Sequence, residues 1–192
     1  MGKRPLRQYL PVLIVIVVWF AASGFLVYYS PEGLIELIGV ENAYVFLLLF
    51  AFASGVSFFG GVPYHMMLIA LAAAGLDPWL LGLSATVGVM LGDSTSYAIG
   101  YHGRALVPVH LEKPIHAISS WLGRRPRFAP LFFLLYGSLV PFSNDFVGVI
   151  TGLARYPFLR VIVPLACGNL IFNTTLAFLT PYLHDTLQLI FS

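Results

Sequence analysis

Hydrophobic positions along this chain form long blocks, with short polar segments between them. There are five such blocks, at residues 9–29, 43–75, 79–101, 128–154 and 158–181. A helix needs about 20 mostly apolar residues to cross the hydrocarbon core of a bilayer. The pattern therefore predicts an all-α integral membrane protein, a polytopic helical bundle.

The second and fourth blocks are each interrupted near the middle. Gly60-Gly61-Val62-Pro63 breaks one, and Pro141-Phe142-Ser143-Asn144 breaks the other. The shorter arms on either side of these breaks would be only about 18–20 Å long as helices, too short to cross comfortably. We therefore predict three crossing helices and two re-entrant helical hairpins, whose tips lie at Pro63 and Pro141. Irregular backbone at that depth is tolerated inside protein or beside a water-filled cavity.

The positions of lysine and arginine indicate an orientation. With the N-terminus placed in the cytoplasm, all ten basic residues fall on the inner side, which agrees with the positive-inside rule. The residues at 30–42, with three glutamates, then form an outer interfacial helix or loop. The segment 110–123 is expected to be a helix on the inner surface, where nearby arginines either contact anionic headgroups or only fix the topology.

This organisation divides the chain into three parts and gives it a location. Residues 1–42 hold the N-terminal transmembrane helix and the interfacial segment, 43–181 form the membrane domain, and 182–192 are a C-terminal tail. We expect a multi-pass protein of the cytoplasmic membrane, in contact with membrane lipids, with a homo-oligomer left as an open alternative.

Composition supports lipid as the solvent, because 59% of residues are apolar and only 9% are charged. The net charge of +2 is too small to indicate a nucleic-acid partner. The histidines lack metal-ligand spacing, and no phosphate-binding loop or hydrolase motif occurs, so we expect no enzyme activity, no metal and no cofactor. The single cysteine, Cys167, lies in an apolar block and is expected to be a small buried packing residue.

The two broken blocks are followed by the same series of features. After Pro63 come Gly75, Pro78 and a crossing helix, and after Pro141 come Gly152, Pro157 and a crossing helix. Because the two copies enter from opposite sides, they would form an inverted repeat. Transporters built on this plan place their site between the repeats near the midplane.

Few ionisable residues lie deep in the apolar blocks, and each is a candidate for function because a charge is costly there. Asp93 is suited to exchanging a proton or binding a cation, or it is a structural carboxylate bonded to Ser96, Tyr97 or another helix. Asp145 and Asn144 begin a short arm, where they either satisfy free backbone N–H groups or form part of a ligand site. His65 is a proton-relay candidate or a structural histidine.

A further polar residue, Asn173, lies in the last crossing helix five positions after a glycine, as Asp93 does in the third block. We expect it to bond between helices or to line a substrate or ion site. Together with Asn169 it is the main polar feature of that helix.

The sequence resembles the DedA family, whose shared region is the VTT domain, over residues 45–180. Three places carry the resemblance: the broken Gly61-Val62-Pro63 with an arm ending at Gly75, the motif described next, and Pro141 with an arm ending at Gly152. The most specific is Gly88-Val-Met-Leu-Gly92-Asp93-Ser-Thr-Ser-Tyr97-Ala-Ile-Gly100-Tyr-His-Gly103, which is similar to the family's G-x-x-x-G-D-x-x-x-Y-x-x-G-x-x-G.

The resemblance implies two re-entrant hairpins in an inverted repeat and the flipping of lipids, with undecaprenyl phosphate as one bacterial substrate and proton or sodium coupling. Two departures bear on the substrate. Many members have a glutamate before the first tip proline, whereas residues 57–62 contain no acid. Arginines flanking the second tip proline are replaced by Ser138 and Asn144, which offer a phosphate no positive charge.

The expected function is movement of a lipid or lipid-like amphiphile across the membrane by flipping or scrambling. The alternatives are ion-coupled export of a small solute and a membrane scaffold that transports nothing. For the first, Asp93, Asp145 and His65 would line the path.

Overall fold

The computed structural model describes residues 31–55, 62–104, 109–140 and 144–191, and the isolated residues Val17, Ala21 and Gly24. The regular structure in these ranges is helical throughout. The helices, in chain order, are α2 (Pro31–Ile38), α3 (Val40–Ser54), α4 (Val62–Ala73), α5 (Pro78–Gly103), α6 (Val109–Arg124), α7 (Phe128–Leu139), α8 (Asp145–Leu153) and α9 (Phe158–Phe191).

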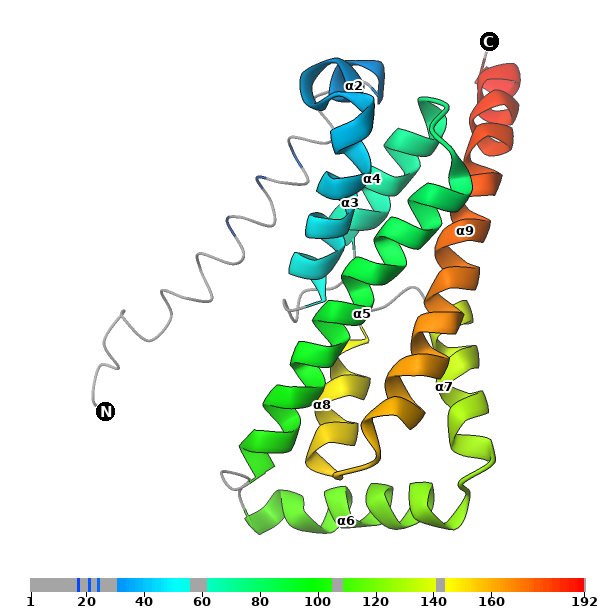
Figure 1. Ribbon diagram of the computed structural model, residues 1–192. Coiled ribbons are helices and arrows are strands. Elements are labelled where there is room, and N and C mark those ends of the chain that lie inside the picture. Colours follow the sequence, from blue (N-terminus) through cyan, green and yellow to red (C-terminus); the bar gives the residue numbers. More distant parts are fainter. Residues whose placement is uncertain are drawn as a thin grey trace, which may run out of the picture.

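Two long helices, α5 and α9, run side by side through the full height of the bundle (Figure 1). Helices α3 and α4 lie beside one half of this pair, α7 and α8 lie beside the other half, and α6 lies across one end. With its 26 residues, α5 is about 39 Å long. The short helices have 9–15 residues and are about 13–22 Å long. Within the described ranges, the segment Phe158–Tyr182 alone is long and apolar enough to cross a membrane, judged by length and composition.

The interruptions predicted in the second and fourth blocks are confirmed as breaks between short helices. The second block forms the two helices α3 and α4, and the fourth block forms α7 and α8. Pro63 lies in the first turn of α4. The tip residues 56–61 and 141–143, which include Pro141, lie outside the described residues, as does almost all of the predicted N-terminal helix at 9–29. Re-entrance into a membrane therefore stays a prediction.

The surface helix predicted at 110–123 is present as α6, and part of the segment 30–42 is the short helix α2. The last predicted helix, 158–181, is longer in the structure, because α9 continues through Pro181 to Phe191. A proline costs a helix one backbone hydrogen bond and a local kink. The proline ring clashes with the carbonyl of the preceding turn and leaves the residues after it able to stay helical, so the helix continues beyond Pro181.

Both short second arms end in the same kind of turn. Gly75 has a φ of +85°, and Arg155 has a φ of 52°, the one positive value for a non-glycine residue in the described ranges. In each turn the next residue donates its N–H to the carbonyl five positions earlier, at 3.2 Å and 3.0 Å. This pattern is a Schellman motif, and it turns the chain from each short arm into the long helix that follows.

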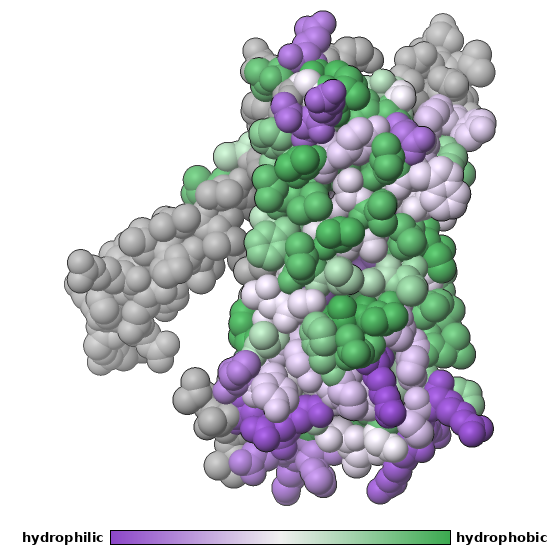
Figure 2. Space-filling model, viewed as in Figure 1, coloured by the Kyte–Doolittle hydropathy of each residue, from purple (hydrophilic) through white to green (hydrophobic). Residues whose placement is uncertain are grey.

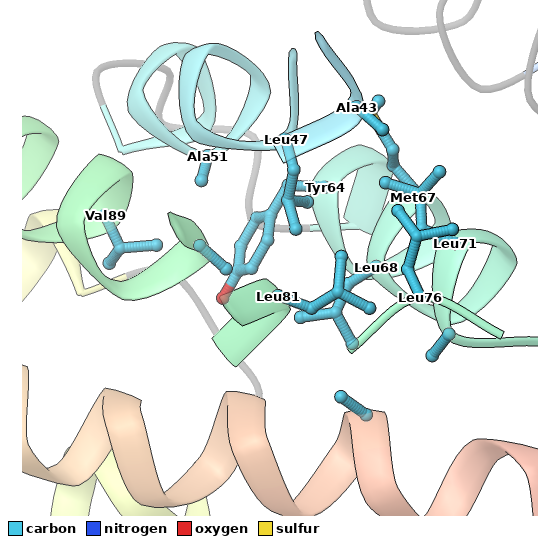
Figure 3. Close-up of a cluster of buried hydrophobic side chains, with 13 residues drawn as sticks. Ala43, Leu47, Ala51, Tyr64, Met67, Leu68, Leu71, Leu76, Leu81 and Val89 are labelled. Atoms are coloured by element: carbon cyan, nitrogen blue, oxygen red, sulfur yellow. The ribbon is translucent and has the colours of Figure 1, made fainter. Parts of the chain in front are cut away.

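An apolar core fills each half of the bundle. Figure 3 shows the core of the first half, where side chains of α3, α4 and α5 meet, with Ala177 contributed by α9. The core of the second half is made by residues of α6, α7, the turn after α8 and α9: Leu122, Ala129, Phe133, Tyr156, Val161 and Leu165.

Glycines let the long helices approach the first arms at equivalent places. A side chain on Gly88 of α5 would collide with the carbonyl oxygen of Leu48 on α3. Its Cβ would also lie 3.0 Å from the backbone nitrogen of Phe52, four residues after Leu48. A side chain on Gly168 of α9 would meet the carbonyl of Leu134 and, at 2.9 Å, the nitrogen four residues beyond it. The same backbone-to-backbone contact thus occurs once in each half.

Apolar side chains also cover the outside of the bundle. Figure 2 shows them across the middle of the visible face, with polar side chains toward both ends. Large exposed examples on the long helices and the first arms include Phe46, Leu49, Leu83, Leu91, Leu131, Phe132, Ile171 and Phe178. Cys167 is also exposed, so the prediction that it packs inside was wrong: in this chain an apolar environment does not require burial in protein.

The basic residues of the described ranges gather at the end of the bundle covered by α6. Arg104, which follows α5, donates to the carbonyl oxygen of Leu153 at the end of α8. The guanidinium of Arg155 lies 5.2 Å from the ring centroid of Tyr101, at the same end. Glu36 lies in α2 at the opposite end (Figure 1). This separation is the one that the charge pattern predicts.

Candidate functional site

Buried polar side chains meet where the N-terminus of α8 reaches the middle of the α5–α9 pair. Asp93 lies 15 residues after the start of α5, and Asp145 is the first residue of α8. Each is only 1% exposed. The sequence 141–144 interrupts the apolar block just before α8. As a result, the amide of Asn144 and the carboxyl of Asp145 lie at the start of α8, in the interior of the bundle.

Asn144 joins this helix start to both long helices. Its Nδ2 donates to Oδ2 of Asp93 at 3.3 Å and to Oδ1 of Asn169, on α9, at 3.0 Å. The backbone of Asn144 occupies the N-cap position of α8, but its side chain makes no capping bond. Capping was the structural alternative for this residue, and the side chain instead makes contacts between helices.

Ser96 supports the second carboxyl. It lies three residues after Asp93 on α5, and its hydroxyl contacts Oδ1 of Asp145 at 3.0 Å and the carbonyl oxygen of Gly55 at 3.2 Å. A hydroxyl has one hydrogen to donate, so these two acceptors share or alternate it. The structural alternative in which Ser96 bonds Asp93 does not occur, because Ser96 points to the neighbouring elements. We call Asp93, Ser96, Asn144, Asp145 and Asn169 the acidic site.

A second buried group lies farther along the same two helices, beside α4. The amide of Asn173, which is fully buried, donates through Nδ2 to Oγ1 of Thr86 at 3.2 Å. The hydroxyl of Tyr64 lies 3.5 Å from Oδ1 of Asn173. We call Tyr64, Thr86 and Asn173 the neutral site. Figure 3 shows the Tyr64 ring inside the apolar core with its hydroxyl directed away from α3.

His65 is half-buried beside this neutral site. Its ring centroid lies 4.0 Å from that of Tyr64 and 5.4 Å from that of Phe172 on α9. His65 therefore lies next to the neutral site, and its place on one path with Asp93 and Asp145 stays a prediction. Sequence reasoning did not select Tyr64 or Thr86, although Tyr64 directly follows the tip proline, as Asn144 follows the other tip.

The stretches of sequence around the acidic site carry carboxyl groups and no lysine or arginine. The chain has no lysine or arginine from residue 8 to 103, from 128 to 154 or after 160. A charge left buried without compensation is very costly. Within the described ranges, Oδ1 of Asp93 and Oδ1 of Asn144 are buried acceptors without a hydrogen-bond donor. The site can therefore exchange a proton or accept a cation among oxygen atoms.

A metal centre of the usual kind is not formed by the described residues, where no group of three or more His, Cys, Asp or Glu side chains could hold a metal ion. The long α5–α9 pair and the tip of α8 instead form a site of two carboxyls and neutral amides.

Comparison with known proteins gives a family. The model of the VTT domain matches residues 62–181, from α4 to the middle of α9, which is more than half of the chain and includes all residues of both sites. No curated protein and no solved structure matches this chain. The match supports the resemblance carried by the Gly88–Gly103 motif and places Asp93 within the family's own domain. The chain therefore belongs to the VTT-domain proteins, that is, to the DedA family.

Proposed function

We propose that this protein is a DedA-type transporter that moves a lipid or lipid-like amphiphile across the cytoplasmic membrane by flipping or scrambling. The observation that supports this most directly is the acidic site itself. Two carboxyl groups, each 1% exposed, lie inside a bundle whose outer surface is apolar. Ionisable side chains at such depth are costly and are usually kept for a transport path.

The arrangement of the helices supports a membrane-embedded transporter with inverted repeats. The short pairs α3–α4 and α7–α8 lie at opposite halves of the α5–α9 pair (Figure 1). Each short helix is about 13–22 Å long, less than the hydrocarbon core of about 30 Å. Two hairpins entering from opposite sides would bring their tips together near the midplane, where transporters of this plan bind substrate.

We further propose that Asp93 couples movement to a proton or a sodium ion. The segments around it supply no lysine or arginine, so a bound proton or cation is the available way to neutralise it. Its contact with Asn144 is 3.3 Å long, slightly longer than a usual N–H···O bond. That contact can be exchanged for one with a bound group.

The test uses purified protein in liposomes that contain fluorescent phospholipids. Movement is measured as the fraction of label that becomes accessible to a membrane-impermeant quencher, over a panel of headgroups, with a pH gradient on or off and with sodium on one side. The proposal expects faster movement than in empty liposomes for at least one headgroup. Movement no faster than in empty liposomes for every headgroup would overturn it.

Ion-coupled export of a small solute is the second candidate. It is favoured by one observation: Asn144 contacts Asp93 and Asn169 at the place where many relatives are expected to hold a phosphate-binding arginine. A solute exporter would leave the lipids unmoved and would show proton flux that depends on added solute. A scaffold would do neither, while Asp93→Asn protein still folded normally.

A further inference from the structure

Two residues of the acidic site and two residues of the neutral site occupy equivalent positions in the two halves of the chain. Adding 80 to a residue number in the first half gives the equivalent residue in the second half. Gly75 corresponds to Arg155, and both residues have a left-handed backbone; Gly88 corresponds to Gly168, and both glycines lie against the backbone of a first arm. The same shift carries Asp93 to Asn173. Asp93 and Asn173 each lie 15 residues after the start of their long helix.

The contacts of the two hairpin tips follow the same shift. It carries Tyr64, in the first turn of α4, to Asn144 at the start of α8. Tyr64 contacts Asn173 on α9, and Asn144 contacts Asp93 on α5. Each tip therefore reaches the equivalent position of the long helix that belongs to the other half. The contact distances, 3.5 Å and 3.3 Å, are both at the long end for hydrogen bonds.

Polar groups on α9 connect the two sites. Asn169 belongs to the acidic site and Asn173 to the neutral site, and they lie one turn apart, about 6 Å along the helix axis. On α5, Thr86 and Asp93 are seven residues apart, so they share a face at a spacing of about 10 Å. Nδ2 of Asn169, a residue that is 5% exposed, makes no bond of normal hydrogen-bond geometry within the described ranges, and Asp93 lies close enough to interact with it. A buried amide donor that is held beside a carboxyl without a well-formed bond can exchange its partner for a ligand group.

The chemistry of the two sites differs in one respect. The acidic site has two carboxyl groups, whereas the neutral site consists of a phenol, an alcohol and an amide. Each of these three groups both donates and accepts hydrogen bonds and carries no charge. A ligand group with the same properties, a hydroxyl, would satisfy all three at once.

We propose that Tyr64, Thr86 and Asn173 form a second binding site, which takes a hydroxyl group of the transported headgroup while the headgroup passes along Asn169 and Asn173 to the acidic site. This inference rests on the proposed function, because it concerns the selectivity of the same path. It makes the neutral site a source of headgroup specificity and leaves binding of the coupling proton or cation to the acidic site.

The experiment compares two labelled lipids of the same net charge in the liposome assay. Phosphatidylglycerol carries two headgroup hydroxyls, and phosphatidylpropanol carries none. The wild-type protein is expected to move phosphatidylglycerol about threefold to tenfold faster, the effect of one or two hydrogen bonds. The double variant Tyr64→Phe with Thr86→Val is expected to move both lipids at the same rate.

The matched control removes the same groups elsewhere on α5. The hydroxyl of Thr95 donates to the carbonyl of Leu91 in its own helix, and the ring of Tyr101 lies against the guanidinium of Arg155. The variant Thr95→Val with Tyr101→Phe is expected to keep the wild-type ratio. A general loss of stability lowers both rates together and leaves their ratio unchanged, so the ratio separates binding from folding. The single variant Tyr64→Phe, which removes one oxygen, is measured in parallel and is expected to lower the ratio.

The outcomes separate the two proposals. A wild-type ratio near one, or a ratio that survives in the Tyr64→Phe and double variants, overturns the neutral site as a hydroxyl site and leaves lipid movement standing; the site would then hold only water. No movement of any labelled headgroup by the wild-type protein overturns the proposed function and the second site with it.

Discussion

Asn144, at the start of the short helix α8, bonds Asp93 in the middle of the long helix α5. The 3.3 Å contact joins the side-chain amide of Asn144, which makes no capping bond in its own helix, to a carboxyl on a neighbouring helix. Because Asn144 also donates to Asn169, a single side chain holds α8 against both long helices. Asn144 therefore connects the start of α8 directly to Asp93.

Replacing Asn144 should weaken the fold measurably. Asn144→Leu removes the donor to Asp93 and Asn169 and leaves buried acceptors without a partner, which costs about 1–3 kcal/mol of unfolding free energy. The measurement is reversible unfolding in detergent micelles. Ser120→Ala serves as the control, since Ser120 is bonded only within its own helix, to the carbonyl of Ala117. Equal stabilities for the two variants would show that the Asn144 bonds contribute nothing to the fold.

The glycines of α5 and α9 should be intolerant of a methyl group. Gly88→Ala and Gly168→Ala each place a Cβ against a carbonyl oxygen of the neighbouring arm, and such overpacking costs about 1–3 kcal/mol or more. Gly123→Ala provides the contrast, because nothing lies within 4 Å of its Cβ position. That variant should be neutral or stabilising by up to about 1 kcal/mol, since alanine favours a helix over glycine. Thermal unfolding of the three variants side by side decides the matter. If Gly88→Ala and Gly168→Ala unfolded like Gly123→Ala, the close approach would be refuted.

The exposed cysteine offers a test of lipid as the surrounding solvent. Cys167 lies on the outer surface of α9, in the part that is apolar enough to cross a membrane. In intact membranes a water-soluble maleimide should leave Cys167 unlabelled, because thiolate formation and reagent entry both require water. After solubilisation and denaturation, labelling should be complete. The control is Ser120→Cys in a Cys167→Ser background, on the polar end helix α6, which should label rapidly in open membrane fragments. Rapid labelling of Cys167 in intact membranes would contradict a lipid-facing α9.

The pattern of apolar blocks predicted most of the helices, because each long helix of this protein coincides with a long run of apolar residues. The breaks near Pro63 and Pro141 separate short helices as expected, and the helix at 79–101 is α5 almost to the residue. The same pattern led to the wrong prediction that Cys167 is buried. Hydrophobicity does not distinguish protein interior from lipid, so the pattern gives no sign of which face of α9 points outward.

The site was predicted only in part because its residues come together from distant positions. Asp93, Asp145 and Asn173 were selected as costly polar residues in apolar blocks, and all three are buried. Tyr64 and Thr86 were missed, since tyrosine and threonine are ordinary in membrane helices and nothing local marks them. The signal for Tyr64 is the 80-residue shift, which becomes visible once Asn144 and Tyr64 are seen to make equivalent contacts.

The central claim, that the buried carboxyl of Asp93 drives movement of lipid, is tested most directly by Asp93→Asn in the liposome assay with the pH and sodium gradients described above. The matched control is Glu112→Gln, which makes the same change in the exposed first turn of α6. The account predicts that Asp93→Asn folds, as judged by its unfolding midpoint, and loses at least about 90% of gradient-stimulated lipid movement, the effect of about 1.4 kcal/mol or more on the rate-limiting barrier. Glu112→Gln should behave as the wild type does. A folded Asp93→Asn protein that moved lipid at the wild-type rate, with the same response to the gradients, would contradict it.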